Sequence, residues 1–169
     1  GLSDRMRLDL AINIMIARAV NGLDLVVNGD GSQWRPFLHV KDASLVILKA
    51  IEAEPKRISG KTWNVGRAEN NYTIDRLAYE IAGHFPKIKI TYVEKNNDMR
   101  SYNVSFEKIA KEFEFTPSYL VSHAIAELKE AFATGKIANM FEDRYYNIRT
   151  IIKNHRKIGD FYSPASTGV

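Results

Sequence analysis

One short segment of the sequence combines residue types that bind phosphate groups. Gly29 and Gly31 are followed by Arg35, and an apolar run then leads to Asp42. Glycine permits positive backbone torsions and close approach of a ligand, and a guanidinium offers a fork of donors that suits phosphate oxygens. The same residues also fit a plain connection between strands, in which Arg35 pairs with Trp34 at the surface. The residue types alone leave both interpretations open.

Other kinds of chemistry are excluded by what the sequence lacks. There is no cysteine, which excludes disulfides, thiolate catalysis and zinc–thiolate sites. There is no glycine fingerprint for a dinucleotide, and no tyrosine is followed four residues later by the lysine that would help it polarise a hydroxyl for hydride transfer. We therefore predict no catalytic residue and no cofactor-binding residue in the chain. We also predict no metal site, because metal-ligand spacing is missing among His39, His84, His123 and His155.

The composition is that of one ordinary globular domain. Of the 169 residues, 45% are hydrophobic and 26% are charged. No apolar run approaches the roughly 18 residues of a membrane span, and the first residues lack the layout of a signal peptide. We therefore expect a cytoplasmic protein without a membrane partner. Because the chain opens at Gly1 without methionine and a helical pattern follows at once, we expect it to be the middle of a longer polypeptide.

The net charge of +4 and the pI of about 9.2 permit an anionic partner. Over most of the chain, basic residues are mixed with acidic ones, and only the last 30 residues concentrate lysine and arginine. Such a segment is usually the solvated face of a helix, although nucleic acid or membrane phosphates would also attract it. Its basic residues are Arg144, Arg149, Lys153, Arg156 and Lys157.

The spacing of apolar residues predicts the elements that position these side chains. Leu8 and Ile12 lie on the apolar side of a helix over 4–20, with Ser3 or Asp4 available as its N-cap. In the rest of the first half we expect a strand over 23–27, a turn over 28–32, a strand over 36–40 and a helix that Asp42 caps and that ends near Glu54, before Pro55.

The second half is predicted to be mostly helical. Its strands are too short and too separated to build an independent doubly wound sheet, so we predict an α/β, mostly helical portion of a larger fold. The expected elements are a strand over 63–65, a helix over 74–84 capped by Thr73, an edge strand over 88–93, helices over 105–113 and 118–133, a stop at Gly135, a last helix over 140–158 and a mobile end over 160–169.

The residues from Gly29 to Asp42 read Gly-Asp-Gly-Ser-Gln-Trp-Arg-Pro-Phe-Leu-His-Val-Lys-Asp. This segment resembles the C-terminal, substrate-binding portion of the extended short-chain dehydrogenases, the NAD-dependent epimerases and dehydratases of nucleotide sugars. Further landmarks of that family follow in the expected order: Asn13 in the first helix, Trp63-Asn64-Val65-Gly66, Tyr72-Thr73-Ile74, and the cluster from Lys95 to Tyr102.

The resemblance implies roles for particular residues. Arg35 would contact the diphosphate of the nucleotide sugar, Asn13 would face it, and His39 and Asp42 would be structural. The backbone of Val26, Val27 and Asn28 would pass the base. The cluster of Lys95, Asp98 and Arg100 would close the site over the nucleotide. Lys95 replaces a common arginine and loses bidentate geometry, whereas Asp98 would either accept a hydrogen bond from the ribose or pair with Arg100.

The resemblance also implies a division of labour within a Rossmann-type fold. Residues 1–135 would form the nucleotide-sugar binding portion and residues 136–169 a helical extension and tail. The NAD-binding Rossmann domain, with the tyrosine base for transient hydride transfer, would lie in an N-terminal half that these residues do not include. The isolated chain would be inactive and would bind no NAD by itself, and the full-length protein would form a homodimer.

Two other functions compete with this interpretation. A non-enzymatic basic helical module could bind nucleic acid or a protein partner through its arginine-rich tail, although no basic-aromatic nucleic-acid motif is present and steep salt dependence would be required. The same framework could also serve the reduction of some other bound group. The sequence favours the epimerase or dehydratase, and it does not identify the base or the sugar.

Overall fold

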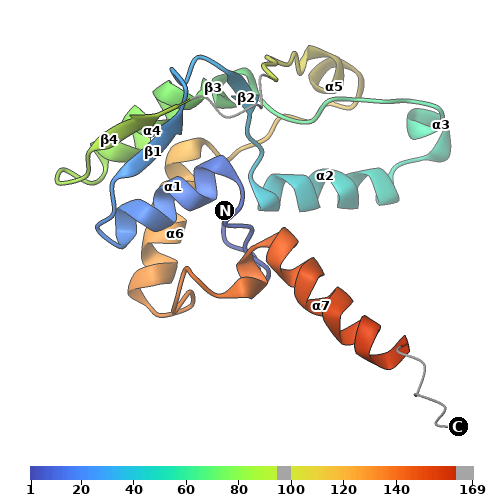
Figure 1. Cartoon of the computed structure of the whole chain (residues 1–169). Coiled ribbons are helices and arrows are strands. Elements are labelled where there is room, and N and C mark those ends of the chain that lie inside the picture. Colours follow the sequence, from blue (N-terminus) through green and yellow to red (C-terminus); the bar gives the residue numbers. More distant parts are fainter. Residues whose placement is uncertain (95–99, 163–169) are drawn as a thin grey trace, which may run out of the picture.

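The computed structural model describes the backbone of residues 1–94 and 100–162, and the side chains of residues 1–94 and 100–154. Helices dominate and the strands are short, which confirms the expected α/β class (Figure 1). In chain order the elements are α1 (Ala11–Val20), β1 (Leu25–Asn28), β2 (Trp34–Pro36), α2 (Val40–Glu52), α3 (Pro55–Ile58), a 3-10 turn (Ala68–Asn70), β3 (Asn71–Thr73), α4 (Ile74–Gly83), β4 (Ile90–Val93), α5 (Glu107–Glu112), α6 (Val121–Ala133), a second 3-10 turn (Asp143–Tyr145) and α7 (Asn147–Tyr162).

The strands of the described residues form two small sheets. β1 and β4 pair in parallel with Leu25 opposite Ile90, and β2 and β3 pair antiparallel with Trp34 opposite Thr73. The expected edge strand is β4, which leaves most of its side chains exposed. Two separate pairs do not make a doubly wound sheet, so helices supply most of the packing.

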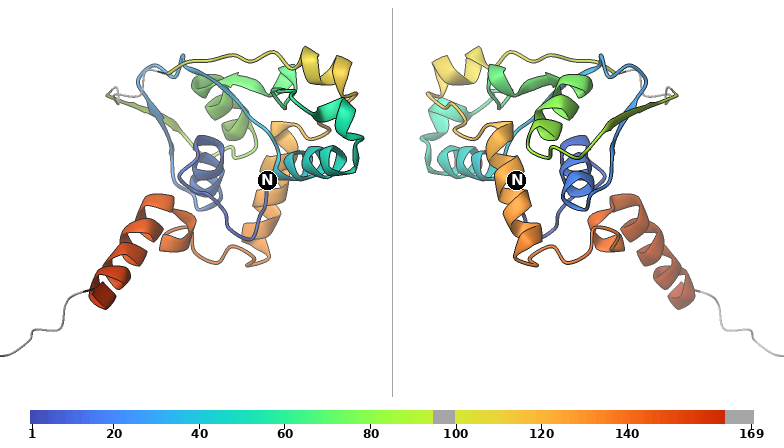
Figure 2. Two further views of the ribbon diagram at one scale, coloured as in Figure 1. Left: turned by 90° about the vertical axis from the view of Figure 1, so that its right-hand side faces the viewer. Right: turned by 90° about the vertical axis from the view of Figure 1, so that its left-hand side faces the viewer.

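The main core lies between α1, β1, α4 and α6. Ile16, Leu25, Leu77 and Ile125 have no exposed surface, as expected for helices whose apolar residues recur at three- and four-residue steps. A second, smaller cluster around Ile109 joins α2 to α5. Figure 2 shows that α7 projects away from the body that the other elements form.

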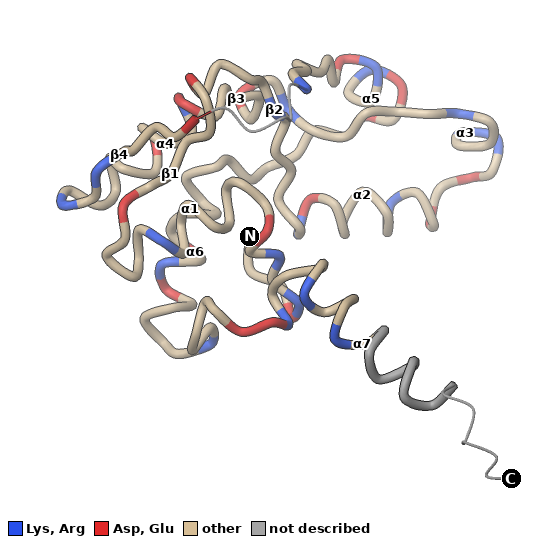
Figure 3. Tube along the Cα trace, in the orientation of Figure 1, with Lys and Arg blue, Asp and Glu red and all other residues tan. Residues whose placement is uncertain are grey.

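The basic segment near the C-terminus is partly neutralised by neighbouring acids (Figure 3). Arg144 Nε lies 2.8 Å from Glu142 Oε2, and Lys153 Nζ lies 3.6 Å from Asp143 Oδ2. These pairs favour the solvated helical face over a nucleic-acid site. Within the described ranges, no helix combines the length and the hydrophobicity needed to cross a bilayer. Arg156 and Lys157, the last two residues of this basic segment, have side chains outside the described part of the structure.

The first helix begins later than its apolar spacing predicts. α1 starts at Ala11, so the expected start at residue 4 and the cap by Ser3 or Asp4 are wrong. The residues before α1 make long-range contacts instead of helical ones. The Leu8 N–H donates to the Tyr145 carbonyl at 2.8 Å, and this bond uses a donor that a helix would pair locally.

Asp42 does not cap its helix, contrary to the sequence prediction. The N-cap of α2 is His39, whose Nδ1 accepts the Lys41 N–H at 3.2 Å. The Asp42 carboxylate is 1% exposed and accepts the N–H groups of Ser118 at 3.0 Å and Tyr119 at 2.9 Å. These two bonds hold the chain just before α6, which begins three residues later than expected.

Strand positions also differ from the prediction. The first two strands occupy 25–28 and 34–36 rather than 23–27 and 36–40. Residues 63–65 form no strand, because no described segment pairs with their backbone. A strand is defined by its neighbour, so apolar alternation alone cannot fix where it begins and ends.

Local stop and start signals agree with the structure. The Thr73 hydroxyl caps α4 by accepting the Arg76 N–H at 3.2 Å. Gly135 follows α6 with φ of +73°, a torsion that glycine adopts without steric cost. Both features depend on neighbours in the sequence, which is why the sequence predicts them correctly.

The last helix is displaced toward the C-terminus. α7 covers Asn147–Tyr162 rather than 140–158, because Met140 and Tyr145 are buried in the main core and the chain turns there. Part of the end expected to be mobile therefore belongs to α7, and residues 163–169 lie outside the described part of the chain.

Candidate functional site

A cavity of about 1110 Å³ lies between α1, the end of β1, β2 and the first turn of α6. Its wall combines apolar residues of α1 with polar groups from five other segments of the described chain, an arrangement typical of a small-molecule site. The structure brings five of the predicted ligand-contact residues to this one cavity: Asn13, Val26, Asn28, Arg35 and Arg100.

The remaining predicted residues are placed differently. The Val27 side chain has no exposed surface and belongs to the main core, because alternate residues of a strand face opposite sides. Val27 does not line the cavity, although its neighbours Val26 and Asn28 do. Lys95 and Asp98 lie outside the described residues.

The glycine turn is held against the start of α4. The Asp75 N–H donates to the Gly31 carbonyl at 2.9 Å. Gly31 has φ of +71°, and a Cβ atom there would lie 2.8 Å from the Asp75 Cβ. Glycine is therefore required at this position both by torsion and by space. Within the turn, Asp30 Oδ1 accepts the N–H of Ser32 at 3.0 Å and its hydroxyl at 2.8 Å, which stiffens the cavity rim.

Arg35 is half-buried in the cavity wall. Its Nη1 donates to the Trp34 carbonyl at 2.8 Å and to the carbonyl of Arg100. Its Cζ lies 5.1 Å from the centre of the Tyr102 ring, within the range of a cation–π contact. The guanidinium is thus oriented by three groups at one side of the cavity.

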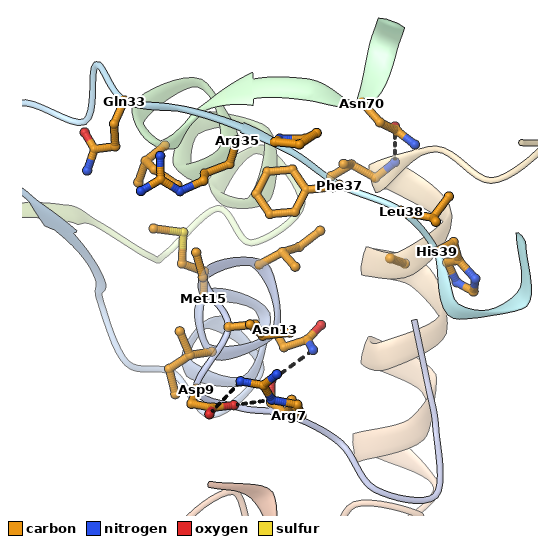
Figure 4. A pocket seen from close by; sticks show the side chains of 18 of the residues that line it. Arg7, Asp9, Asn13, Met15, Gln33, Arg35, Phe37, Leu38, His39 and Asn70 are labelled. Carbon is orange, nitrogen blue, oxygen red and sulfur yellow. Dashed lines mark hydrogen bonds and ion pairs between the residues drawn. The ribbon is translucent and has the colours of Figure 1, made fainter. Parts of the chain in front are cut away.

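Asn13 lies across the cavity from Arg35 (Figure 4). Its Nδ2 donates to the Arg7 carbonyl at 3.0 Å, and its side chain is buried. Arg7 forms a bidentate pair with Asp9 at 3.1 and 3.0 Å, and this pair raises the pKa of Arg7 and lowers that of Asp9. Both residues line the cavity. Sequence reasoning missed them because it placed them inside a helix.

His39 and Glu127 form a polar contact at the base of the site. Because His39 Nδ1 accepts a backbone N–H, its Nε2 carries the proton and donates to Glu127 Oε2 at 2.9 Å. Burial lowers the pKa of His39, so the imidazole is neutral at neutral pH. The Leu2 N–H donates to the same Oε2 at 2.8 Å, and Glu127 Oε1 accepts from Lys41 Nζ. This network ties α6 to the start of α2.

Glu127 should make folding stability depend on acid pH. Burial by itself raises the pKa of the carboxyl, but hydrogen bonds from Lys41 and the Leu2 N–H lower it to about 2, below its ordinary 4.5. A lowered folded-state pKa stabilises the fold above 4.5, and this contribution is lost as pH falls toward 2. We expect Glu127→Gln to cost about 1–2 kcal/mol of unfolding free energy near pH 6 and progressively less below pH 4.

Urea denaturation at several pH values measures this effect. Glu130→Gln, on the exposed side of the same helix, is the matched control and should leave the pH profile unchanged. A Glu127→Gln deficit that stays constant from pH 6 to pH 2.5 would contradict the assigned pKa.

Comparison with known proteins identifies relatives of this chain. Residues 6–66 match the model of the NAD dependent epimerase/dehydratase family. The dTDP-glucose 4,6-dehydratase of Actinoplanes sp. is 29% identical over 119 residues, which cover 69% of this chain and 36% of that protein. The solved dTDP-glucose 4,6-dehydratase of Bacillus anthracis, in complex with NAD, is 26% identical with a TM-score of 0.61, over 77% of this chain and 41% of that one.

A more distant structure shows the same fold. The UDP-glucuronic acid 4-epimerase of Bacillus cereus, in complex with UDP-glucuronic acid and NAD, has a TM-score of 0.62 at 19% identity, over 76% of this chain and 41% of that one. The chain therefore spans well under half the length of the relatives it matches. The family match over residues 6–66 includes two of the segments that line the cavity, α1 with the residues before it and the chain from Val26 to Val40. In sequence and in fold, the chain is therefore similar to members of the NAD-dependent epimerase/dehydratase family.

Proposed function

We propose that this chain is the substrate-binding portion of an NAD-dependent enzyme that epimerises or dehydrates a nucleotide sugar. The observation that carries the proposal is the meeting of Asn13, Asn28, Arg35 and Arg100 in one cavity. A nucleoside diphosphate needs groups that bind its phosphates and a surface that contacts its base. The two arginines can bind the phosphates, and the end of β1 can contact the base. The ligands named for the relatives are of this kind.

Each residue would have a separate role in binding. Arg35 and Arg100 would neutralise the diphosphate, with Asn13 donating or accepting across from them. The backbone of residues 26–28 would pass the base. Lys95 and Asp98 keep the roles that the sequence suggests for them, closing the nucleotide side of the site.

The described residues do not fit NAD itself. In dinucleotide-binding folds the pyrophosphate rests on a glycine-rich turn that leads from a strand directly into a helix. Here the turn after β1 leads into β2, and Gly31 is packed against Asp75. We therefore assign NAD and the catalytic base to another portion of the enzyme, and we expect the isolated chain to be inactive. A homodimer and a cytoplasmic location remain part of the proposal for the complete enzyme.

Two features of the described residues favour packing of this chain against a further part of the enzyme. α2 packs on the second cluster with one side, yet its other side exposes Ile47, Leu48 and Ile51, with 60%, 50% and 76% of their surface accessible. A helix that is apolar on both sides is normally buried on both. In addition, among the described residues no partner is found for the backbone N–H groups of residues 63–66. Both features suit packing against a further sheet.

Calorimetric titration tests the proposed function. UDP, dTDP, GDP and CDP are compared with the corresponding nucleosides at fixed salt. We expect at least one diphosphate to bind saturably and about tenfold or more tightly than its nucleoside, because a charge-assisted hydrogen bond contributes about 1.5–3 kcal/mol. Equal affinity for diphosphate and nucleoside, or no saturable binding of any of them, would contradict the proposal.

A further inference from the structure

Residues 100–102, here called the clamp segment, lie along the edge of β2 that faces away from β3. The Trp34 N–H donates to the Ser101 hydroxyl at 3.0 Å, and the Tyr102 N–H donates to the Trp34 carbonyl at 3.2 Å. The opposite edge of β2 pairs with β3, where Arg35 lies opposite Tyr72. Both backbone groups of Trp34 are therefore held by the clamp segment.

The clamp segment also determines where the Arg35 guanidinium points. Nη1 donates to the Arg100 carbonyl, which belongs to the clamp segment, and to the Trp34 carbonyl, which the clamp segment holds. The ring of Tyr102 lies 5.1 Å from the Arg35 Cζ. A long arginine side chain loses considerable rotamer entropy when it is fixed. Part of this entropy cost for Arg35 is already incurred in the unliganded protein, because these contacts form within the chain itself.

We infer that Ser101 is a positioning residue: its hydroxyl fixes the clamp segment on β2 and thereby orients Arg35 for a diphosphate. The inference rests on the proposed function, since it assigns Arg35 a phosphate ligand. Loss of the hydroxyl leaves the Trp34 N–H without its acceptor and loosens the Arg100 carbonyl and the Tyr102 ring from the guanidinium. An arginine that is ordered only on binding binds more weakly than one ordered beforehand.

The test compares Ser101→Ala, Ser101→Thr and the control Ser105→Ala by calorimetry. Ser105 lies outside the cavity, and its hydroxyl accepts the Glu107 N–H at 3.4 Å. We expect Ser101→Ala to weaken binding of the best nucleoside diphosphate about three- to tenfold, as for loss of one hydrogen bond. Affinity for the nucleoside should not change, because the nucleoside does not use Arg35. Ser101→Thr should restore binding to within about twofold, since threonine keeps the hydroxyl.

A double-mutant cycle separates positioning from general damage. In an Arg35→Ala background, Ser101→Ala should cause no further loss, because the residue through which it acts is gone. The inference is overturned if Ser101→Ala leaves diphosphate affinity unchanged, weakens diphosphate and nucleoside equally, or causes the same loss in both backgrounds.

Amide hydrogen exchange tests the clamp segment without a ligand. Ser101→Ala should accelerate exchange of the Trp34 and Tyr102 N–H groups, while exchange in α4 stays unchanged. Unchanged exchange at both amides overturns the inference whatever the ligand results. If the wild-type chain binds no diphosphate, the proposed function fails and the assignment of Ser101 to phosphate binding fails with it, even where exchange shows that the clamp segment exists.

Discussion

Replacement of Arg35 by alanine is expected to weaken nucleoside diphosphate binding about 10- to 100-fold. A charge-assisted hydrogen bond is worth about 1.5–3 kcal/mol, and each 1.4 kcal/mol corresponds to a factor of ten. Arg35→Lys should give an intermediate loss, because lysine keeps the charge but not the planar fork that matches two phosphate oxygens. Calorimetry with the diphosphate and its nucleoside at one salt concentration measures both variants.

The control for this experiment is Arg57→Ala. Arg57 lies on α3, pairs with Glu114 at 3.3 Å and does not line the cavity, so its loss removes the same charge without touching the site. Affinity within about twofold of wild type is expected for the control. Wild-type affinity in Arg35→Ala, or an equal loss in Arg57→Ala, would show that general electrostatics and not the site binds the diphosphate.

Replacement of Asp42 by alanine is expected to lower the free energy of unfolding by about 3 kcal/mol. The carboxylate is 1% exposed and accepts two backbone N–H groups, from Ser118 and Tyr119. Its removal leaves two donors without acceptors, each at a cost of about 1–3 kcal/mol when it is shielded from water. For a chain of this size the loss corresponds to a fall in Tm of about 6–12 °C, measurable by circular dichroism and urea denaturation.

A conservative variant and a control variant test the interpretation of the Asp42→Ala result. Asp42→Asn should also destabilise, because only one amide oxygen can accept and the NH2 group would face a second N–H. Asp24→Ala is the matched control: its exposed carboxylate accepts one bond, from the Lys89 N–H at 3.1 Å, and its loss should cost less than about 1 kcal/mol. If Asp42→Ala costs no more than Asp24→Ala, the carboxylate does not hold the chain before α6.

Much of the fold follows from the sequence because it depends on near neighbours. The apolar spacing in α4 and α6, the Thr73 cap and the stop at Gly135 involve residues within a few positions of one another. The glycine turn and the arginine after it are likewise a local pattern. The same local sequence pattern carries the family resemblance, and it is sufficient to select Asn13 and Arg35 as candidate ligand contacts.

The tertiary structure decided what depends on distant partners. α1 starts later than predicted because the segment before it hydrogen bonds to Tyr145. The Asp42 carboxylate accepts the Tyr119 N–H because the fold brings these two residues together. Ser101 and Trp34 are 67 positions apart. Hydrogen bonds between residues so far apart leave no periodic pattern in a sequence. The sequence by itself therefore determined which side chains could bind a phosphate. Only the tertiary structure decided which of these side chains face one cavity and which contacts hold them there.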